Sequence, residues 1–208
     1  MRAVLYDWDG TLLDSAETSF RCYRSAFAAV GIAFERADFD RTYSPEWYRT
    51  YAAVGLPEVR WPEADELWLE HYRRQGSDLI PGARAALARV EGRGLAQGLV
   101  SSGDGTRVRR ELASLQVEPL FAAVVCGGET TRRKPDPEPL RLALERLGVE
   151  PAEAAYVGDS PEDIEMARAG RVFSVGIPGG FPNREALLAA APDLVASSLA
   201  EAVEALLG

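Results

Sequence analysis

The spacing of hydrophobic residues differs between the first 80 residues and the rest of the chain. Residues 3–6 form a short apolar run, which is typical of a buried parallel strand. Phe20, Tyr23, Phe27 and Val30 then recur at helical spacing, and Gly31 supplies a stop. Aromatic-rich helical pieces continue to about residue 75 with few strand-like runs. This pattern predicts a helical segment that follows one N-terminal strand.

After residue 79 the pattern becomes a regular alternation of helix and strand. Such alternation is typical of α/β proteins with a parallel, doubly wound sheet, that is, a Rossmann-like core. We therefore predict the α/β fold class. The predicted helices are 83–90, 107–115, 139–147, 161–169 and 199–207, and the predicted strands are 94–101, 122–126, 154–157 and 172–177.

These two textures predict one α/β core that is interrupted after its first strand. We assign residues 1–14 and 81–208 to the core and residues 15–80 to a small helical cap domain. Pro81 and Gly82 mark the return to the core. An insertion that leaves from the loop after the first strand is well placed to act as a lid.

Asp7 and Asp9 directly follow the first predicted strand. Residues at the carboxyl ends of strands in an open α/β sheet line the crevice where ligands bind. Two neighbouring carboxylates repel each other unless a cation intervenes, and Mg²⁺ prefers oxygen ligands. The pair therefore indicates a Mg²⁺ site, with an Asx-type turn capped by Asp9 as the alternative.

Two later strand ends carry groups that suit a phosphate. Ser101 and Ser102 precede a glycine, so a hydroxyl and free backbone amides are available there; the alternative is a helix N-cap turn leading into Asp104. Lys134 lies in a proline-stiffened loop and is the single lysine among the 23 basic residues. A compact ammonium differs in shape from a planar guanidinium, which draws attention to this position. For the arginines at 132 and 133, a solvated basic patch is the favoured interpretation.

The fourth strand end is the segment Gly158 to Asp163. Asp159 directly follows the apolar strand 154–157 and offers a third carboxylate. Pro161 fits the start of a helix, so the alternative is that Asp159 or Ser160 serves only as its cap.

Composition limits the classes of partner. Apolar residues make up 47% of the chain, charged residues 26%, and the net charge is −9, so we expect a globular protein without a nucleic-acid partner. The chain lacks the roughly 20-residue apolar run of a membrane span, so we expect no membrane partner either. Cys22 and Cys126 are too few for a disulfide framework, and we expect buried thiols in a reducing cytoplasm.

The segments DWDGTLLD, VSSG, KPDP and GDSPED occur in this order and spacing. Together they resemble the haloacid dehalogenase superfamily of phosphotransferases over the full length of the chain. The insert after the first segment resembles the small helical cap of its phosphoglycolate phosphatase and β-phosphoglucomutase branch. The resemblance implies that Asp7 attacks the substrate phosphorus and forms an aspartyl-phosphate. It also implies that Asp9 protonates the leaving oxygen and then activates the water that hydrolyses this intermediate.

The same resemblance implies the roles of the other strand ends. Ser101, Ser102 and Lys134 would bind the transferring phosphoryl group. Mg²⁺ would be bound by Asp7, the backbone carbonyl of Asp9 and Asp159, with Asp163 supporting the metal loop. An acid two residues after the nucleophile suits a phosphate ester, whose leaving oxygen needs a proton.

We therefore expect a Mg²⁺-dependent phosphatase for a small phosphorylated metabolite, with phosphoglycolate as the first candidate. The alternative is a sugar phosphomutase of the β-phosphoglucomutase type. Such mutases usually carry a histidine early in the cap, where this chain has Ser19. The one histidine, His71, lies far along the cap and is interpreted as structural. A non-catalytic, receiver-like signalling module is disfavoured, because receiver domains lack such a cap. For the oligomeric state, we expect a monomer or homodimer.

The substrate contact in the cap is predicted from a basic and aromatic cluster. Arg49 is the leading candidate for a distal anionic group of the substrate, with ordinary packing of the aromatic residues as the alternative. The cluster consists of Arg41, Tyr43, Trp47, Tyr48 and Arg49.

Overall fold

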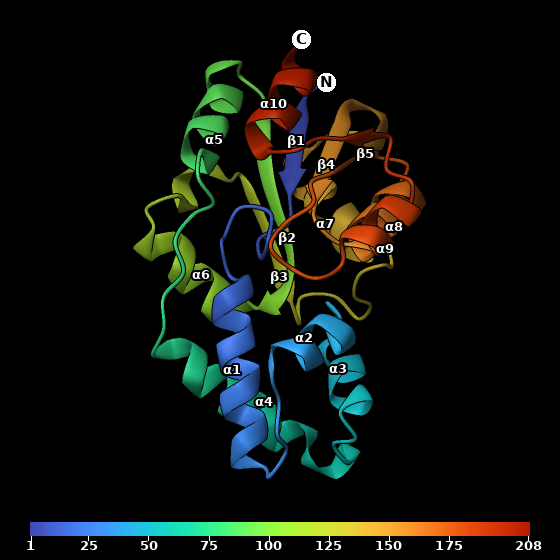
Figure 1. Cartoon of the computed structure of the whole chain (residues 1–208). Helices are drawn as coiled ribbons and strands as arrows, with labels where there is room; N and C mark the ends of the chain where they lie inside the picture. Colours follow the sequence, from blue (N-terminus) through green and yellow to red (C-terminus); the bar gives the residue numbers. More distant parts are fainter.

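The computed structural model describes all 208 residues and has a six-stranded parallel sheet at its centre (Figure 1). The strand order is β3-β2-β1-β4-β5-β6, so the sequence grows outward from β1 in both directions. This arrangement confirms the predicted doubly wound α/β fold. The strands are β1 Ala3–Tyr6, β2 Ala96–Asp104, β3 Ala123–Gly127, β4 Ala154–Gly158, β5 Phe173–Gly176 and β6 Leu194–Val195.

Helices cover both faces of the sheet because the side chains of each strand alternate between them. On one face, Val4 and Tyr6 of β1 join the buried residues of α5 (Ala83–Gly92), α6 (Gly105–Ser114) and α10 (Leu199–Leu207). On the other face, Ala3 and Leu5 pack with α7 (Glu138–Leu147) and α8 (Pro161–Gly170). The short α9 (Arg184–Ala189) packs against α8.

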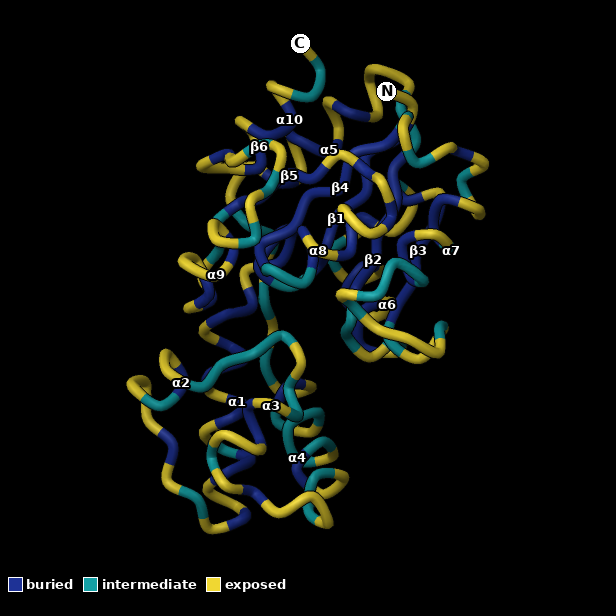
Figure 2. The backbone as a smooth tube through the Cα atoms, turned by 90° about the vertical axis from the view of Figure 1, so that its right-hand side faces the viewer, coloured by how far each residue is buried: buried dark blue, intermediate teal, exposed yellow.

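The insert after β1 is entirely helical and lies beyond the carboxyl ends of the strands (Figure 1). It has an aromatic core of its own, which also receives Phe181 from the loop after β5. Figure 2 shows buried backbone along the sheet and exposed loops at the far end of the insert. The insert helices are α1 Ala16–Ala29, α2 Arg36–Thr42, α3 Trp47–Ala53 and α4 Trp61–Arg73; short 3₁₀ turns occupy Glu58–Arg60, Glu118–Leu120 and Pro151–Glu153.

Two antiparallel segments connect the insert to the sheet. Leu13 pairs with Leu79, and the amide of Ile80 donates to the carbonyl of Leu12 at 2.8 Å. The amide of Asp14 donates to the carbonyl of Asp78 at 2.9 Å. The insert thus leaves and re-enters the core at one place, directly after Asp9.

The structure differs from the predicted elements mainly at their ends. Strand β2 continues to Asp104, three residues past the predicted end, because its last part pairs irregularly with β3. Helix α9 and strand β6 were not predicted, and both are shorter than the patterns that periodicity detects. Cys22 and Cys126 are buried free thiols. No helix combines the length and the apolar character that crossing a membrane requires.

Candidate active site

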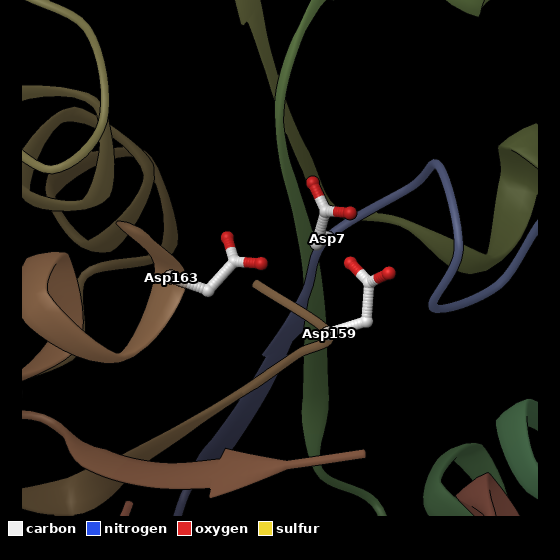
Figure 3. A group of neighbouring side chains, drawn as sticks. All are labelled: Asp7, Asp159 and Asp163. Atoms are coloured by element: carbon white, nitrogen blue, oxygen red, sulfur yellow. The ribbon is translucent and has the colours of Figure 1, made fainter. Parts of the chain in front are cut away.

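Three carboxylates from the ends of β1 and β4 and from α8 meet at the edge of the sheet that faces the insert. Oxygen atoms of Asp7, Asp159 and Asp163 all lie within 4.8 Å of one another, and all three side chains are buried. Figure 3 shows the carboxyl groups directed toward a common region. The pairing of Tyr6 with Val157 sets the relative position of Asp7 and Asp159, because each comes within two residues of this pair.

The single lysine of the chain lies among these acids. The Lys134 ammonium donates to Asp7 Oδ1 at 2.6 Å, to Asp163 Oδ1 at 2.7 Å and to the Tyr156 hydroxyl at 2.7 Å. These three acceptors use all three N–H donors of the ammonium. Burial lowers the pKa of Lys134, but the charges of Asp163 and Asp7 outweigh this effect and raise it above its usual value. The lysine therefore stays charged beside Asp7.

Asp163 and Asp159 differ in their contacts. Asp163 Oδ1 accepts from Lys134, and its Oδ2 accepts from the amide and the hydroxyl of Ser160 at 3.1 and 2.8 Å. Both of its oxygens are thus occupied by protein donors. Asp159 Oδ2 is buried without a hydrogen-bond partner. Asp159 therefore has a buried oxygen available to a cation, and Asp7, whose Oδ1 alone accepts from Lys134, has its Oδ2 available as well.

The donor set fits a hard divalent cation such as Mg²⁺. Burial raises the pKa of Asp7 to about 7, even though Lys134 acts in the opposite direction. Burial, together with the charge of Asp7, raises the pKa of Asp159 well above its usual range. A cation bound between the two carboxylates would remove this electrostatic cost, and Mg²⁺ takes carboxylate oxygens as ligands.

Gly10 allows the loop after β1 to pass close to the carboxylate of Asp159 at the end of β4. Its φ angle is +88°, and a Cβ atom at this position would lie 2.2 Å from Asp159 Oδ2. A side chain there would displace the carboxylate that lacks a partner. The glycine of the DWDGT segment is thus required by both the turn and the site.

Asp9 points to a different set of partners from Asp7. Arg107 Nη1 and Nη2 donate to its two oxygens at 3.1 and 2.5 Å, and the Ser15 hydroxyl donates to Oδ1 at 2.8 Å. Burial tends to raise the pKa of Asp9, but Arg107 and Ser15 hold it below the usual value. The Asx-turn alternative does not describe this carboxylate, because its partners are side chains.

The loop after β2 supplies the hydroxyl and amide groups at the same edge. Ser101 is buried, and its hydroxyl accepts from the amide of Gly103 at 3.0 Å. The N-cap of the following helix is Asp104, whose side chain accepts from the amide of Arg107 and caps α6; the two serines do not have this role. Ser160 caps α8 in the same way, which leaves Asp159 free of that role.

A cavity of about 430 Å³ lies between this group and the insert. Its floor includes Asp7, Asp9, Ser101, Ser102, Lys134 and Asp159, and its roof is largely aromatic. The structure therefore brings together all of the predicted core site residues. The aromatic residues on the insert side are Tyr23, Tyr43, Trp47, Tyr48, Tyr51 and Trp68.

The predicted cluster in the insert divides into two parts. Its three aromatic residues line the cavity, whereas Arg41 and Arg49 do not. Arg49 is exposed and forms an ion pair with Glu46 at 2.8 Å. Arg133 is exposed, as the prediction of a solvated patch requires, and it also lines the cavity with its guanidinium 4.5 Å from the ring centre of Trp47. Arg132 is a surface residue paired with Asp136, as expected for that patch.

Two further residues of the site were not predicted. Arg107 donates hydrogen bonds to the carboxylate of Asp9. The Tyr156 hydroxyl accepts from Lys134 and donates to the carbonyl of Val100 at 2.9 Å, so it orients the lysine. Arg107 had one signal in the sequence, namely Glu111 four residues later on the same helix. Tyr156 lies within an apolar strand, where its pattern resembles ordinary core packing.

Sequence comparisons agree with this geometry. Residues 4–177 match the family described as haloacid dehalogenase-like hydrolase, and the chain belongs to this family. A phosphoglycolate phosphatase of Yersinia pestis is 30% identical over 220 residues, which cover 99% of this chain and 93% of the relative. The corresponding enzyme of Escherichia coli K12 is 29% identical, with coverage of 99% and 92%. The chain is thus a hydrolase of phosphoric monoesters, a phosphatase.

Solved structures show the same fold. A Haemophilus somnus protein described as a predicted phosphoglycolate phosphatase superimposes with a TM-score of 0.88 at 20% identity, covering 99% of this chain and 98% of the other. A Thermotoga maritima protein, provisionally described as a β-phosphoglucomutase, gives a TM-score of 0.79 at 26% identity with coverage of 99% and 98%. The predicted resemblance to the phosphoglycolate phosphatase and β-phosphoglucomutase branch of the family is confirmed.

Proposed function

We propose that this enzyme is a Mg²⁺-dependent phosphatase that hydrolyses a small phosphorylated metabolite through an aspartyl-phosphate on Asp7. The observation that supports it most is the arrangement of Asp7 at the floor of the cavity. One of its oxygens is held by the Lys134 ammonium, and the unpartnered oxygen of Asp159 lies nearby. A carboxylate is a competent covalent catalyst when it divides a difficult displacement into two steps.

In the first step, the second oxygen of Asp7 attacks phosphorus and forms a P–O bond while the bond to the ester oxygen breaks. Arg107 and Ser15 favour the carboxylate form of Asp9 in the free enzyme, so Asp9 must take up a proton as the negatively charged phosphate binds beside it. It gives this proton to the departing oxygen, and an alcohol leaves. Lys134 redirects one N–H from its present protein acceptors to a phosphoryl oxygen, and the Ser101 hydroxyl and the amides after Ser102 bind the other phosphoryl oxygens. Their preset positions stabilise the charge of the transferring group without reorganisation.

In the second step, water attacks the phosphorus of the aspartyl-phosphate. Asp9, now a carboxylate, takes a proton from this water, and the P–O bond to Asp7 breaks. Inorganic phosphate leaves, and both aspartates return to their first states.

Asp7, Asp159 and the backbone carbonyl of Asp9 are the groups that we propose to hold Mg²⁺, with Asp163 fixing the loop through Lys134 and Ser160. The ion would neutralise the negative charge of the phosphoryl group and of the two buried carboxylates. The Lys134 ammonium, which contacts Asp7, serves the same end.

We further propose residues 15–80 as a cap that closes the cavity and selects the substrate. Phosphoglycolate is the first substrate to assay, because the relatives reported above are named for it. Its carboxylate would need a cationic partner. Arg133 is placed at the cavity for this role, whereas Arg49, the residue expected from the sequence, pairs with Glu46 outside it.

The phosphomutase is the second candidate, favoured by the likeness to the Thermotoga structure. The position at which we expect the histidine of a mutase is occupied by Ser19, which lines the cavity. A serine hydroxyl is a poor proton carrier at neutral pH. Therefore a phosphatase is the better proposal.

A phosphate-release screen tests the proposal. Purified enzyme is incubated with phosphoglycolate, β-glucose 1-phosphate, other phosphorylated metabolites and p-nitrophenyl phosphate, with Mg²⁺ or with a chelator. We expect phosphate release that requires Mg²⁺ and that is abolished in Asp7→Asn. Conversion of β-glucose 1-phosphate into an isomer faster than phosphate appears would identify a mutase, and labelling of Asp7 without turnover would identify a receiver-like module.

A further inference from the structure

Arg107 is a buried arginine that the reaction described above does not use. Its side chain is only 6% exposed, although it lies at the first turn of α6 beside the cavity. Its guanidinium contacts both oxygens of Asp9 and also Glu111 at 3.2 Å. One cation thus bridges the Asp9 carboxylate and a second acid of its own helix.

The surroundings of Arg107 fix its guanidinium from several sides. Glu111 is itself held by the Trp8 indole, which donates to Oε2 at 2.7 Å. The Tyr72 ring of α4 in the insert lies 4.9 Å from the guanidinium carbon. On the remaining side, a Cβ atom at Gly103 would lie 2.1 Å from Arg107 Nη2, so a side chain there would displace this end of the guanidinium. Sequence and packing together form a fitted site for this group.

Among the donors to Asp9, Arg107 alone contacts both carboxylate oxygens. Ser15 donates to Oδ1 only. Two parallel N–H···O bonds from a guanidinium fix the plane of a carboxylate as well as its position. A carboxyl group that must meet a leaving oxygen benefits from such control, because small errors in placement cost large factors in rate.

We propose that Arg107 is a positioning residue that orients the Asp9 carboxyl group toward the leaving-group oxygen, with Glu111 and Trp8 holding Arg107 in place. This inference rests on the proposed function. A direct role in binding the substrate is disfavoured, because the guanidinium already serves Asp9 and Glu111. The contact with Tyr72 also links this orientation to the insert, since α4 belongs to it.

The leaving group provides the test. Activity is measured as kcat/KM for 2,4-dinitrophenyl, p-nitrophenyl and phenyl phosphate, for propyl phosphate and for phosphoglycolate. This parameter covers the steps up to formation of the aspartyl-phosphate and excludes its hydrolysis. Dinitrophenolate departs without a proton, whereas an alkoxide needs one from Asp9. We expect Arg107→Ala to lower kcat/KM about 100-fold for propyl phosphate and less than about 3-fold for dinitrophenyl phosphate.

Two further measurements separate orientation from folding. Methylguanidinium added to Arg107→Ala should restore part of the activity on propyl phosphate and leave that on dinitrophenyl phosphate unchanged. Arg107→Lys should show the same dependence of kcat/KM on the leaving group, with a smaller loss than Arg107→Ala. The ammonium keeps the positive charge but cannot donate in parallel to both oxygens of Asp9. This second variant also serves if Arg107→Ala does not fold. The matched control is Arg109→Ala, because Arg109 lies on the same helix but is exposed and pairs with Glu129.

The alternative outcomes overturn the inference. An equal loss on all five esters would assign Arg107 a purely structural role. A loss confined to phosphoglycolate, with propyl phosphate unaffected, would make it a substrate-binding residue. If the wild-type enzyme released no phosphate from any of these esters, the proposed phosphatase function would fail, and the role of Arg107 with it.

Discussion

At the scale of single residues, the shape of each cationic group decides what it does in the cavity. The compact ammonium of Lys134 meets three acceptors that surround one point. The planar guanidinium of Arg107 instead bridges two carboxylates: it donates to both oxygens of Asp9 and also to Glu111. Exchange of either group for the other would leave buried acceptors unpaired.

The residues of the motifs could be predicted from the sequence because their spacing is local. Asp7 and Asp9 are two positions apart, and Asp159 directly follows a recognisable strand. Arg107 and Arg133 could not be assigned in this way. The fold buries Arg107 beside Asp9 and leaves Arg133 exposed at the cavity, and periodicity does not distinguish either residue from the other arginines.

The two candidate arginines for a distal anion can be compared directly. Arg133→Ala should raise KM for phosphoglycolate about 10-fold, because it removes one charge-assisted contact with the carboxylate. KM for p-nitrophenyl phosphate, which lacks a second anion, should stay unchanged. Steady-state kinetics on both substrates checks this.

Arg49→Ala and Arg132→Ala are the matched controls, since both side chains are exposed and form ion pairs outside the cavity. Neither should alter KM for phosphoglycolate. A rise in KM for Arg49→Ala, with none for Arg133→Ala, would restore the original expectation from the sequence.

At the scale of elements, the parallel sheet and the positions of β1 to β5 along the chain followed from the alternation of apolar runs, whereas strand ends and β6 did not. The register of β2 against β3 shifts after Val100, and the strand then extends to Asp104. That shift depends on contacts with β3, where a Cβ atom on Gly127 would lie 2.4 Å from the carbonyl oxygen of Ser102. Such an approach between segments distant in sequence is invisible to a local pattern.

Glu129 illustrates how such elements are tied together, and it gives a prediction about pH. Its carboxylate accepts from the amide of Cys126 in β3 at 2.9 Å, from Arg109 of α6 at 3.3 Å and from Arg146 of α7 at 2.9 Å. Burial tends to raise the pKa of Glu129, but these contacts lower it below the ordinary 4.5. The folded state therefore binds this proton less readily than the unfolded state. Its stabilising effect is full above about pH 4.5 and is lost as pH falls through the folded-state pKa.

Glu129→Gln should consequently lower the free energy of unfolding by about 1–2 kcal/mol at pH 7. The difference from wild type should shrink as pH falls below 4.5, where the wild-type carboxylate becomes protonated. Urea unfolding at a series of pH values measures it. Glu118→Gln is the control, because Glu118 is exposed. A difference that is constant with pH would contradict the assignment.

At the scale of the whole molecule, the insert and the core share a boundary that contains the reaction. The linkers pair through Leu13 and Leu79, and the cavity lies between the two parts. Besides the linkers, the ring of Phe181 from the core stacks on Tyr43 of the insert at 4.5 Å. Phe181 thus belongs in space to the aromatic core of the insert.

We expect Phe181→Ala to weaken this connection by about 3 kcal/mol, the usual cost of removing a buried aromatic ring. The insert should then unfold at a lower temperature than the core and become more sensitive to protease between residues 74 and 78. Calorimetry and limited proteolysis measure these effects. Leu188→Ala, at a side chain that is 41% exposed, is the control, and an unchanged single transition would refute the prediction.

The single lysine has a practical consequence for chemical labelling. Lys134 is the only side-chain amine in the protein, and its ammonium is 6% exposed and held by two carboxylates. The fold thus shields the one lysine from acylating reagents. Acylation of Lys134 should be slow in the folded protein and fast after unfolding in urea, so the rate of lysine labelling would report how often the cavity opens.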